Sequence, residues 1–192
     1  MEAFLRALLP RLLGDRATFE VYPHQGKDDL LGKLGDRLRG YARWLPNDWR
    51  IVIVLDRDGD DCACLKEQMD RIADAAGLTT RTAARTPCWR VVNRVAIEEL
   101  EAWYFGDWEA VRATYPGVHP SIPQQAAFRN ADAVMGGTWE AFERVLQRAG
   151  HFKGGLRKIE AARMLGKVMD PARNRSRSFS AFRNAVIEAV RC

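Results

Sequence analysis

Two aspartates follow the most apolar short run of the chain. Residues 51–55 are five consecutive aliphatic side chains, and Asp56 and Asp58 come directly after them, with Asp60 and Asp61 close behind. Such a run is typical of a buried strand in an α/β sheet, and α/β folds bind ligands at the carboxyl ends of their strands. Side chains two positions apart on a strand leave the same face, so Asp56 and Asp58 are expected to converge on a hard cation such as Mg²⁺ or Mn²⁺.

The acidic segment also has a purely structural interpretation. Aspartate is common in turns and at helix N-caps, and Asp60 or Asp61 would cap the helix that is predicted to follow. An isolated Asp-x-Asp pair fits both interpretations. The strongly apolar strand in front of it is the observation that favours a metal site.

Two more stretches carry residues suited to the same chemistry. Glu98 and Glu101 stand at the start of a predicted helix, and their i, i+3 spacing places them on one face, where they would join the aspartates as metal ligands. Glutamates at a helix N-terminus also interact favourably with the macrodipole without any metal. Lys153, between two predicted helices and beside Gly154 and Gly155, would bind a phosphate or stabilise developing negative charge, unless it is an ordinary surface lysine.

Basic residues gather in a few segments of this protein of net charge +5, among them 81–94, 157–158 and 173–177. An acidic cluster in a basic protein suggests a polyanion held beside a metal, although a solvated basic surface would give the same composition. Lys27 follows Gly26, but this segment is not an ATP-binding P-loop, because it lacks the earlier glycine and the Ser or Thr that would follow the lysine. The predicted nucleic-acid-binding residues are Lys27, Lys153, Arg175 and Arg177.

Length and composition indicate a globular protein with a full core. The chain has 192 residues, of which 47% are hydrophobic and 29% charged, and no apolar run approaches the ~20 residues that span a bilayer. The amphipathic N-terminus is interrupted by charges and lacks a cleavage site, so we expect no signal peptide. The four cysteines, Cys62, Cys64, Cys88 and Cys192, form no Cys-x-x-Cys pair. Reduced thiols in a cytoplasmic, non-membrane protein are favoured over zinc ligands.

Hydrophobic periodicity predicts alternating strands and helices, followed by helices alone. The expected strands are 17–22, 50–55, 79–83 and 90–97, and the expected helices are 2–13, 28–44, 62–76, 98–105, 107–114, 138–149, 155–168 and 178–190. This order predicts an α/β fold whose parallel or mixed sheet is flanked by helices. We divide the chain into an α/β core, 1–114, and a mostly helical C-terminal extension, 115–192, packed on that core.

Several of these stretches together resemble a known family. The strand ending in Asp56-Arg-Asp58, the segment 98–107, and the segments 152–154 and 169–171 look like an uncharacterised bacterial family with a Toprim-like fold. The resemblance covers nearly the whole chain. Members of that family resemble the Toprim half of OLD-type nucleases, and are often encoded beside an AAA- or ABC-type ATPase in loci suspected of antiphage defence. The resemblance implies a metal-dependent phosphodiester-cleaving site with Asp56, Asp58 and Glu101.

The chain departs from the Toprim-like pattern at its beginning. Toprim-like proteins begin with a strand that ends in a glutamate, and a second acidic residue then opens the first helix. Glu2 matches only that second position, so the first strand and its glutamate are expected to be missing here. We favour a gene start assigned too late, or a shortened sequence, over genuine loss of the residue, because loss of a central strand would leave an open apolar sheet edge.

The function predicted from these observations is metal-dependent hydrolysis of nucleic acid by a Toprim-like nuclease. Its expected partners are nucleic acid and an AAA- or ABC-type ATPase, with a homo-oligomer as a further possibility. One alternative is a non-catalytic regulatory or partner-binding subunit of such a system, and another is a small-molecule phosphoesterase. The predicted metal ligands for Mg²⁺ or Mn²⁺ are Asp56, Asp58, Glu98 and Glu101, and the predicted catalytic residues are Glu2, Asp56, Asp58, Glu101 and Lys153.

Overall fold

A two-stranded parallel sheet forms the centre of the α/β part of the molecule. The computed structural model describes residues 1–86 and 88–191. Within them, β1 (Ile51–Asp56) pairs with β2 (Val91–Ala96), in a register that runs from Ile51 opposite Val91 to Asp56 opposite Ala96. The predicted α/β class with a helical C-terminal part is therefore confirmed. Pro87, predicted to separate two β-rich segments, and Cys192, predicted to be a reduced thiol, lie outside the described residues.

The predicted helices are found close to their expected positions. The helices are α1 (Glu2–Leu13), α2 (Lys27–Trp44), α3 (Cys62–Ala75), α4 (Glu101–Gly106), α5 (Trp108–Thr114), α6 (Thr138–Arg148), α7 (Lys158–Val168) and α8 (Arg177–Ala189), with short 3-10 turns at η1 (Gly14–Arg16), η2 (Ile122–Gln124) and η3 (Ala131–Ala133). Asp61 caps α3 by accepting a hydrogen bond from the Cys64 amide, as the structural interpretation of the acidic turn predicted. The cap of α8 is Ser176, whose hydroxyl accepts a hydrogen bond from the Phe179 amide.

Two predicted strands are wrong. Residues 17–22 run as an extended chain that makes no backbone hydrogen bond with another described strand. Residues 79–83 contribute a single parallel bridge, Thr80 with Val91, before the chain turns. Both segments have the alternation of a strand, but alternation reports which side is apolar and not whether a pairing partner lies alongside.

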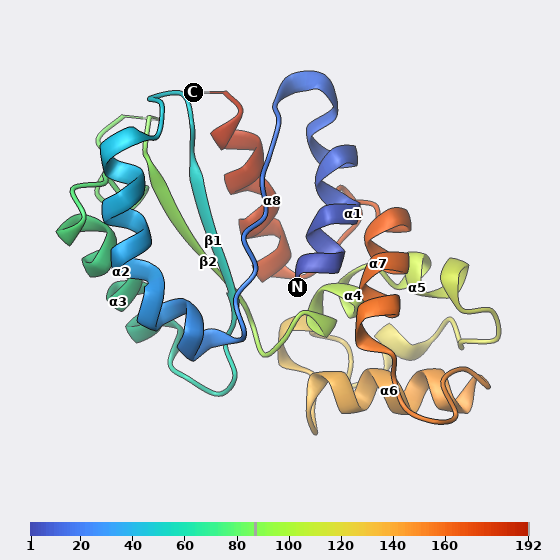
Figure 1. Ribbon diagram of the computed structural model, residues 1–192. Coiled ribbons are helices and arrows are strands. Elements are labelled where there is room, and N and C mark those ends of the chain that lie inside the picture. The colour runs from blue at the N-terminus through green and yellow to red at the C-terminus, as the bar shows by residue number, and fades with distance from the viewer. Residues whose placement is uncertain (87, 192) are drawn as a thin grey trace.

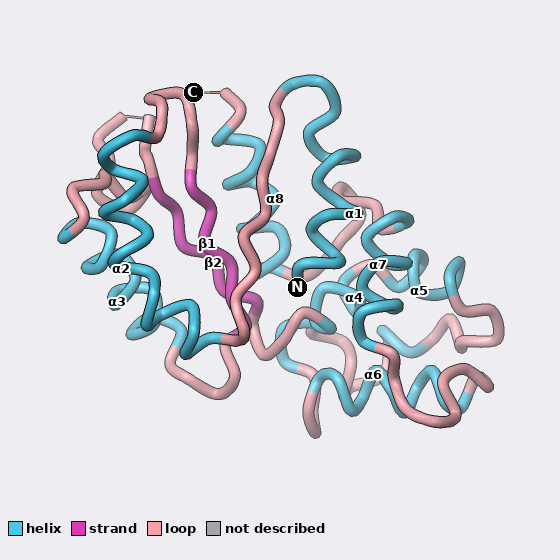
Figure 2. Tube along the Cα trace, in the orientation of Figure 1, coloured by secondary structure: helices cyan, strands magenta, loops and turns pink. Residues whose placement is uncertain are grey.

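Helices cover both faces of the small sheet (Figures 1 and 2). One face, carrying Ile53 and Leu55, packs against α2 and α3 in a separate apolar cluster. The other face packs against α8, where Val92 meets Ala185 and Trp89. The extended segment 17–22 runs down beside β1 and α8 to the start of α2 (Figure 1).

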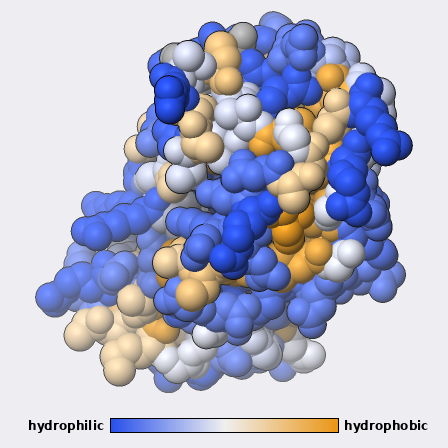
Figure 3. Space-filling model, turned by 90° about the vertical axis from the view of Figure 1, so that its left-hand side faces the viewer, coloured by the Kyte–Doolittle hydropathy of each residue, from blue (hydrophilic) through white to orange (hydrophobic). Residues whose placement is uncertain are grey.

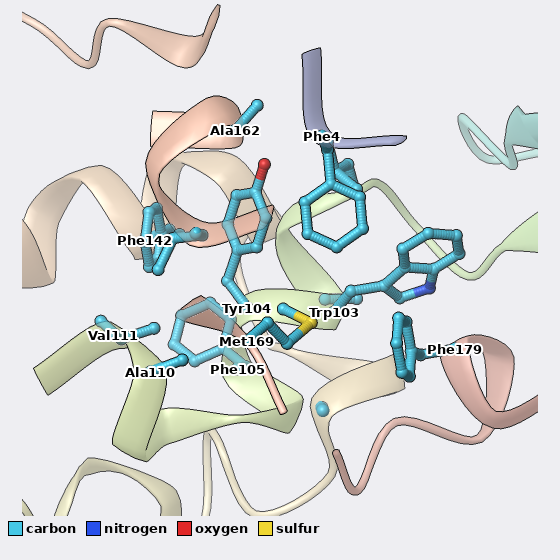
Figure 4. Packing of buried hydrophobic residues seen from close by; sticks show 14 of the residues in the cluster. Phe4, Trp103, Tyr104, Phe105, Ala110, Val111, Phe142, Ala162, Met169 and Phe179 are labelled. Atoms are coloured by element: carbon cyan, nitrogen blue, oxygen red, sulfur yellow. The ribbon is translucent and has the colours of Figure 1, made fainter. Parts of the chain in front are cut away.

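The remaining helices form a second, larger core around α4. All six residues of α4 are buried, and the aromatic rings of Trp103, Tyr104 and Phe105 pack against Phe4 of α1 and Phe142 of α6 (Figure 4). The predicted C-terminal extension therefore packs on the N-terminal part of the chain. Helices α1 and α7 approach so closely that a Cβ atom on Gly166 would lie 2.7 Å from the Phe4 carbonyl oxygen.

Two general expectations can be compared with the fold. No helix among residues 1–86 and 88–191 has the length and apolar character needed to cross a membrane. Cys62, Cys64 and Cys88 are free thiols, in agreement with the expectation of unpaired cysteines.

Candidate metal centre at the carboxyl end of β1

Asp56 combines two features of a strained carboxylate, a buried oxygen without a hydrogen-bond donor and a raised pKa. It is the last residue of β1, and its Oδ1 atom is buried without any hydrogen-bond partner. The pKa of Asp56 is raised to about 6, mainly by burial and to a smaller extent by the negative charges of Asp58 and Glu99. The N-terminal ammonium of Met1 acts in the opposite direction and lowers it. A buried carboxylate oxygen without a donor is costly, so this site favours a proton or a cation.

Glu101 faces the same place from another element. It is the first residue of α4 and only 5% exposed. Its pKa is raised to about 7, mainly by burial; the charge of Lys158 acts to lower it, and the charges of Glu99 and Asp56 act to raise it. Asp56 and Glu101 are therefore two buried acids close enough to affect each other, and both hold protons more tightly than ordinary carboxylates.

The structure separates Asp58 from the strand face that the sequence had assigned to it. Because β1 ends at Asp56, the expectation that the two aspartates share one face of a strand is wrong. Asp58 lies in a turn with a left-handed φ of 50°, and its side chain is half exposed. Lys27 lies 3.8 Å from Asp58 and 2.6 Å from Asp60, so this predicted phosphate ligand neutralises the acidic turn. The hydrogen bond to Asp60 is the main cause of the raised pKa of Lys27.

Glu98 does not share a helix face with Glu101, which corrects the second geometric expectation. Helix α4 begins only at Glu101, because Glu98 has a left-handed φ of 62° and its carbonyl oxygen accepts hydrogen bonds from the amides of Arg57 and Asp58. The Glu98 carboxylate is paired with the guanidinium of Arg57. The charge of the Glu98 carboxylate is thus already neutralised by an ion pair, whereas the carboxylates of Asp56 and Glu101 have no such pair among the described residues.

Three residues that the sequence analysis did not single out belong to the site. Glu99 accepts a hydrogen bond from the Trp139 amide at the start of α6, and burial raises its pKa. Lys158, at the start of α7, faces Glu99 and Glu101 and lies 4.2 Å from the centre of the Trp139 ring. The buried hydroxyl of Tyr104 has no hydrogen-bond partner, and it points toward Ala162 of α7 in Figure 4. Burial is the main cause of the raised pKa of Tyr104, and the charges of Glu101 and Asp56 also raise it.

The other predicted site residues lie apart from these acids. Lys153, predicted to bind a phosphate, is exposed in the turn before α7, whereas Lys158 is near enough to Glu99 and Glu101 for its charge to lower their pKa values. The side chains of Arg175 and Arg177 are exposed, while the backbone between them is anchored to Gly106 and Asp132. Glu2 is half exposed and pairs with Arg6 at 2.7 Å. A charge pattern alone could not have placed any of them, because it does not report which side chains fold inward.

The donor atoms at Asp56 and Glu101 suit a divalent metal ion. Both are carboxylates, the orphaned Oδ1 of Asp56 lacks a donor, and Mg²⁺ often takes only one or two protein carboxylates, with waters and phosphate oxygens completing its shell. Among residues 1–86 and 88–191, no three His, Cys, Asp or Glu side chains form a closed metal-binding group. The residues therefore fit a metal shared with a substrate or solvent rather than one enclosed by protein.

Comparison with known proteins identifies one matching family model. The family model described as "Domain of unknown function (DUF4276)" matches residues 1–187. The chain belongs to this family. No curated protein and no solved structure matches the chain significantly. Membership in the DUF4276 family therefore identifies relatives of the fold without assigning a reaction, and the chemistry must be argued from the site itself.

Proposed function

We propose that this DUF4276 protein hydrolyses phosphodiester bonds of nucleic acid with the help of Mg²⁺ or Mn²⁺. The observation that carries the proposal is the buried Asp56 Oδ1 without a donor, beside a second buried acid, Glu101, whose pKa is about 7. Perturbed acids without protein partners are typical of sites that act on a ligand. The resemblance to Toprim-like nucleases points to the same chemistry at the same residues.

Each residue of the site has a role in this proposal. Asp56 and Glu101 would hold the metal, with Asp58 or Glu99 nearby for a second contact. When bound, the ion supplies charge neutralisation for the phosphate oxygens and acidifies a water molecule. Glu101, whose pKa is about 7 before the ion binds, would lose its proton on binding, and its second carboxylate oxygen would then take up the proton of the attacking water. Lys158 brings a positive charge toward the same acids, where it would bind a phosphate oxygen.

The substrate is proposed to be nucleic acid because of the basic segments. Lys153, Arg175 and Arg177 are exposed cations available to contact phosphates outside the site. Lys27 contributes less, because it is already paired with Asp58 and Asp60. A cytoplasmic location and an AAA- or ABC-type ATPase partner rest on the composition and on the family resemblance, and we keep both as part of the proposal.

A second candidate is a regulatory subunit of such a system that cleaves nothing. It is favoured by one observation: Asp58 and Glu98 are engaged by Lys27 and Arg57, so only two of the four predicted ligands are free of a cationic partner. In that case the acids would serve protein stability or partner binding. The two candidates differ in whether Asp56 is needed for turnover.

The deciding experiment is a cleavage assay on plasmid and single-stranded substrates in Mn²⁺. We expect slow cleavage that Asp56→Asn reduces by at least about a hundredfold, as for loss of a principal electrostatic group in other active sites. Asp61→Asn is the matched control, because it removes a charge from the same acidic segment and keeps an N-cap residue on α3. Cleavage unaffected by Asp56→Asn, or absent from the wild type with and without an ATPase partner, would leave the regulatory candidate.

A further inference from the structure

Three exposed aromatic side chains line one groove of the molecule. Among residues 1–86 and 88–191, the large aromatic side chains that remain exposed are those of Tyr22, Trp44 and Trp49, at 55%, 63% and 39%. All three line a groove of about 1020 Å³, which also involves β1, segment 17–24 and residues of α1, α2 and α8. On the side of the molecule seen in Figure 3, apolar surface (orange) lies in a hollow between hydrophilic margins. Exposed aromatic rings gathered at one place indicate an interaction surface.

Tyr41 joins two of these rings into a continuous series. The centre of the Tyr41 ring lies 6.3 Å from that of Tyr22 and 5.7 Å from that of Trp44. The guanidinium of Arg37 lies over the Tyr22 ring, 5.9 Å from its centre. Arg37, Tyr41 and Trp44 follow one another on α2 at intervals of four and three residues, so they share one face of that helix. We call Tyr22, Tyr41 and Trp44 the aromatic row.

Arginines without an acidic partner accompany the aromatic row. Arg16, Arg37 and Arg50 line the same groove, and none of them forms an ion pair with a carboxylate in the part of the chain that the structure describes. Arg16 and Arg50 donate to backbone carbonyl oxygens instead, which fixes their side chains without neutralising them. The acids near them, Glu20 and Asp48, are exposed. Each guanidinium has five N–H donors, so donors remain that can bind phosphate oxygens.

The groove connects the aromatic row with the candidate metal centre. Asp56 and Glu101 line it at the carboxyl end of β1. The end of α2 lies beside the start of β1, because Arg90 donates to the Leu45 carbonyl oxygen while its own carbonyl oxygen accepts from the Ile51 amide. The length of β1, roughly 17 Å at about 3.3 Å per residue, therefore separates the two ends. About five nucleotides, stacked at roughly 3.4 Å each, would cover this distance.

We infer that the aromatic row binds single-stranded nucleic acid and directs it along the groove toward Asp56. Bases stack on the rings of the row, and Arg37 and Arg50 contact the phosphates. The ligand is a single strand because the bases of a duplex stack on one another and offer few free ring faces, whereas aromatic side chains combined with cations are typical of single-strand binding. The inference rests on the proposed function for its choice of nucleic acid, and it adds the form of the substrate. Stacking itself needs neither metal nor cleavage.

The test measures binding in EDTA, by fluorescence anisotropy of labelled oligothymidylate and oligouridylate of about twelve nucleotides. The two probes distinguish DNA from RNA. Trp44→Ala should weaken binding of the preferred strand by about ten- to a hundredfold, as for loss of a stacked base, and Trp44→Tyr should restore most of the affinity. Met135→Ala is the matched control, because it truncates a side chain that is 72% exposed and lies outside the groove. It should leave the affinity unchanged.

A second variant tests the phosphate contacts. Arg37→Gln should weaken binding to every sequence and reduce the slope of log Kd against log salt by about 1. Its control is Arg148→Gln, which removes an exposed arginine at the end of α6, away from the groove, and should leave the slope unchanged. Because Arg37 and Trp44 are both exposed, neither variant removes a buried part of the core.

Three results would overturn the inference. The first is a duplex of the same length that binds as tightly as the single strand. The second is equal affinity in the wild type, Trp44→Ala and Arg37→Gln. The third is no binding to either oligonucleotide, and self-association that Trp44→Ala abolishes would then assign the surface to a second copy. These readouts are separate from the nuclease assay. Single-strand binding that depends on Trp44 without any cleavage would contradict only the proposed hydrolysis, and cleavage with unchanged binding in Trp44→Ala would contradict only this inference.

Discussion

Asp107 and Asp56 both bury carboxylate oxygens, but they differ in the hydrogen bonds that these oxygens accept. Asp107 is 1% exposed, and its carboxylate accepts hydrogen bonds from the Asp170 amide at 2.7 Å, from two nitrogens of Arg173 at 2.7 and 3.1 Å, and from the Ala110 amide. Asp56 is buried at its Oδ1 atom and receives no donor there. The fold can therefore satisfy a buried carboxylate fully, and it does so where the carboxylate holds segments together. In our proposal, the Oδ1 atom of Asp56 lacks a donor because it binds a ligand.

The same contrast extends to the surroundings of the two residues. Asp107 joins the start of α5 to the segment after α7, and nearby Asp132 is similarly engaged by Ser176, Ser178 and the Arg177 amide. These contacts explain why the segment 173–178, predicted to bind phosphates, is buried at every second residue. Near Asp56, by contrast, the charges of Asp58 and Glu99 raise its pKa, and the N-terminal ammonium of Met1 lowers it. Around Asp107, charged and polar groups pair and hold segments together. Around Asp56, several negative charges lie near one another.

The largest effect is expected for the structural aspartate. Asp107→Ala should lower the free energy of unfolding by about 3–4 kcal/mol, because it removes the cap of α5 and leaves the Asp170 amide and Arg173 without their acceptor. Urea denaturation at pH 7 provides the measurement. The metal response of the folded variant should equal that of the wild type. A loss below about 1 kcal/mol would mean that Asp107 and Asp56 do not differ in the way we describe.

A smaller effect of opposite sign is expected at Asp56. Its folded pKa of about 6 lies above the usual value of 3.8, so between about pH 4 and pH 6 the unfolded chain releases its proton first. Stability should therefore fall as pH rises through this window in the metal-free protein, and stay lower above it. Asp56→Asn removes the cost of the buried charge and should raise the unfolding free energy by about 2 kcal/mol at pH 8.

The control for this prediction is Asp61→Asn, and the comparison is made at two pH values. At pH 8 the Asp56→Asn variant should be more stable than both the wild type and Asp61→Asn. At pH 3 the advantage should disappear, because the wild-type carboxyl is then largely protonated in the folded and unfolded states. An advantage of equal size at both pH values would show that the gain does not come from the ionised carboxylate.

The sequence predicted where this candidate site lies better than it predicted which side chains line it. The aliphatic run before Asp56 is long enough to define β1, and the apolar spacing elsewhere located all eight helices. Glu101 was singled out because it stands at the start of a predicted helix, three residues after Glu98, and because the family resemblance implied it. The sequence could not reveal that Glu98 turns to Arg57, because a left-handed φ at a glutamate leaves no pattern in neighbouring residues.

The remaining errors have a common physical cause. Segment 17–22 was predicted to be a strand because its apolar residues alternate, yet strand formation needs a partner whose presence no local pattern reports. Lys158 was seen only as part of a basic pair, and its position near Glu99 and Glu101 depends on how α7 packs against α1 and α5. Contacts between residues far apart in the chain decided both cases.

Calorimetric titration of Mn²⁺ into the wild type, Asp56→Asn and Asp61→Asn tests the central claim most directly. We predict that the wild type and Asp61→Asn bind the ion with similar affinity and release protons at pH 6.5, as Asp56 and Glu101 give up the protons that burial lets them retain. Binding should be lost in Asp56→Asn. Equal affinity in all three proteins, or no proton release from the wild type, would contradict the claim that Asp56 is reserved for a cation.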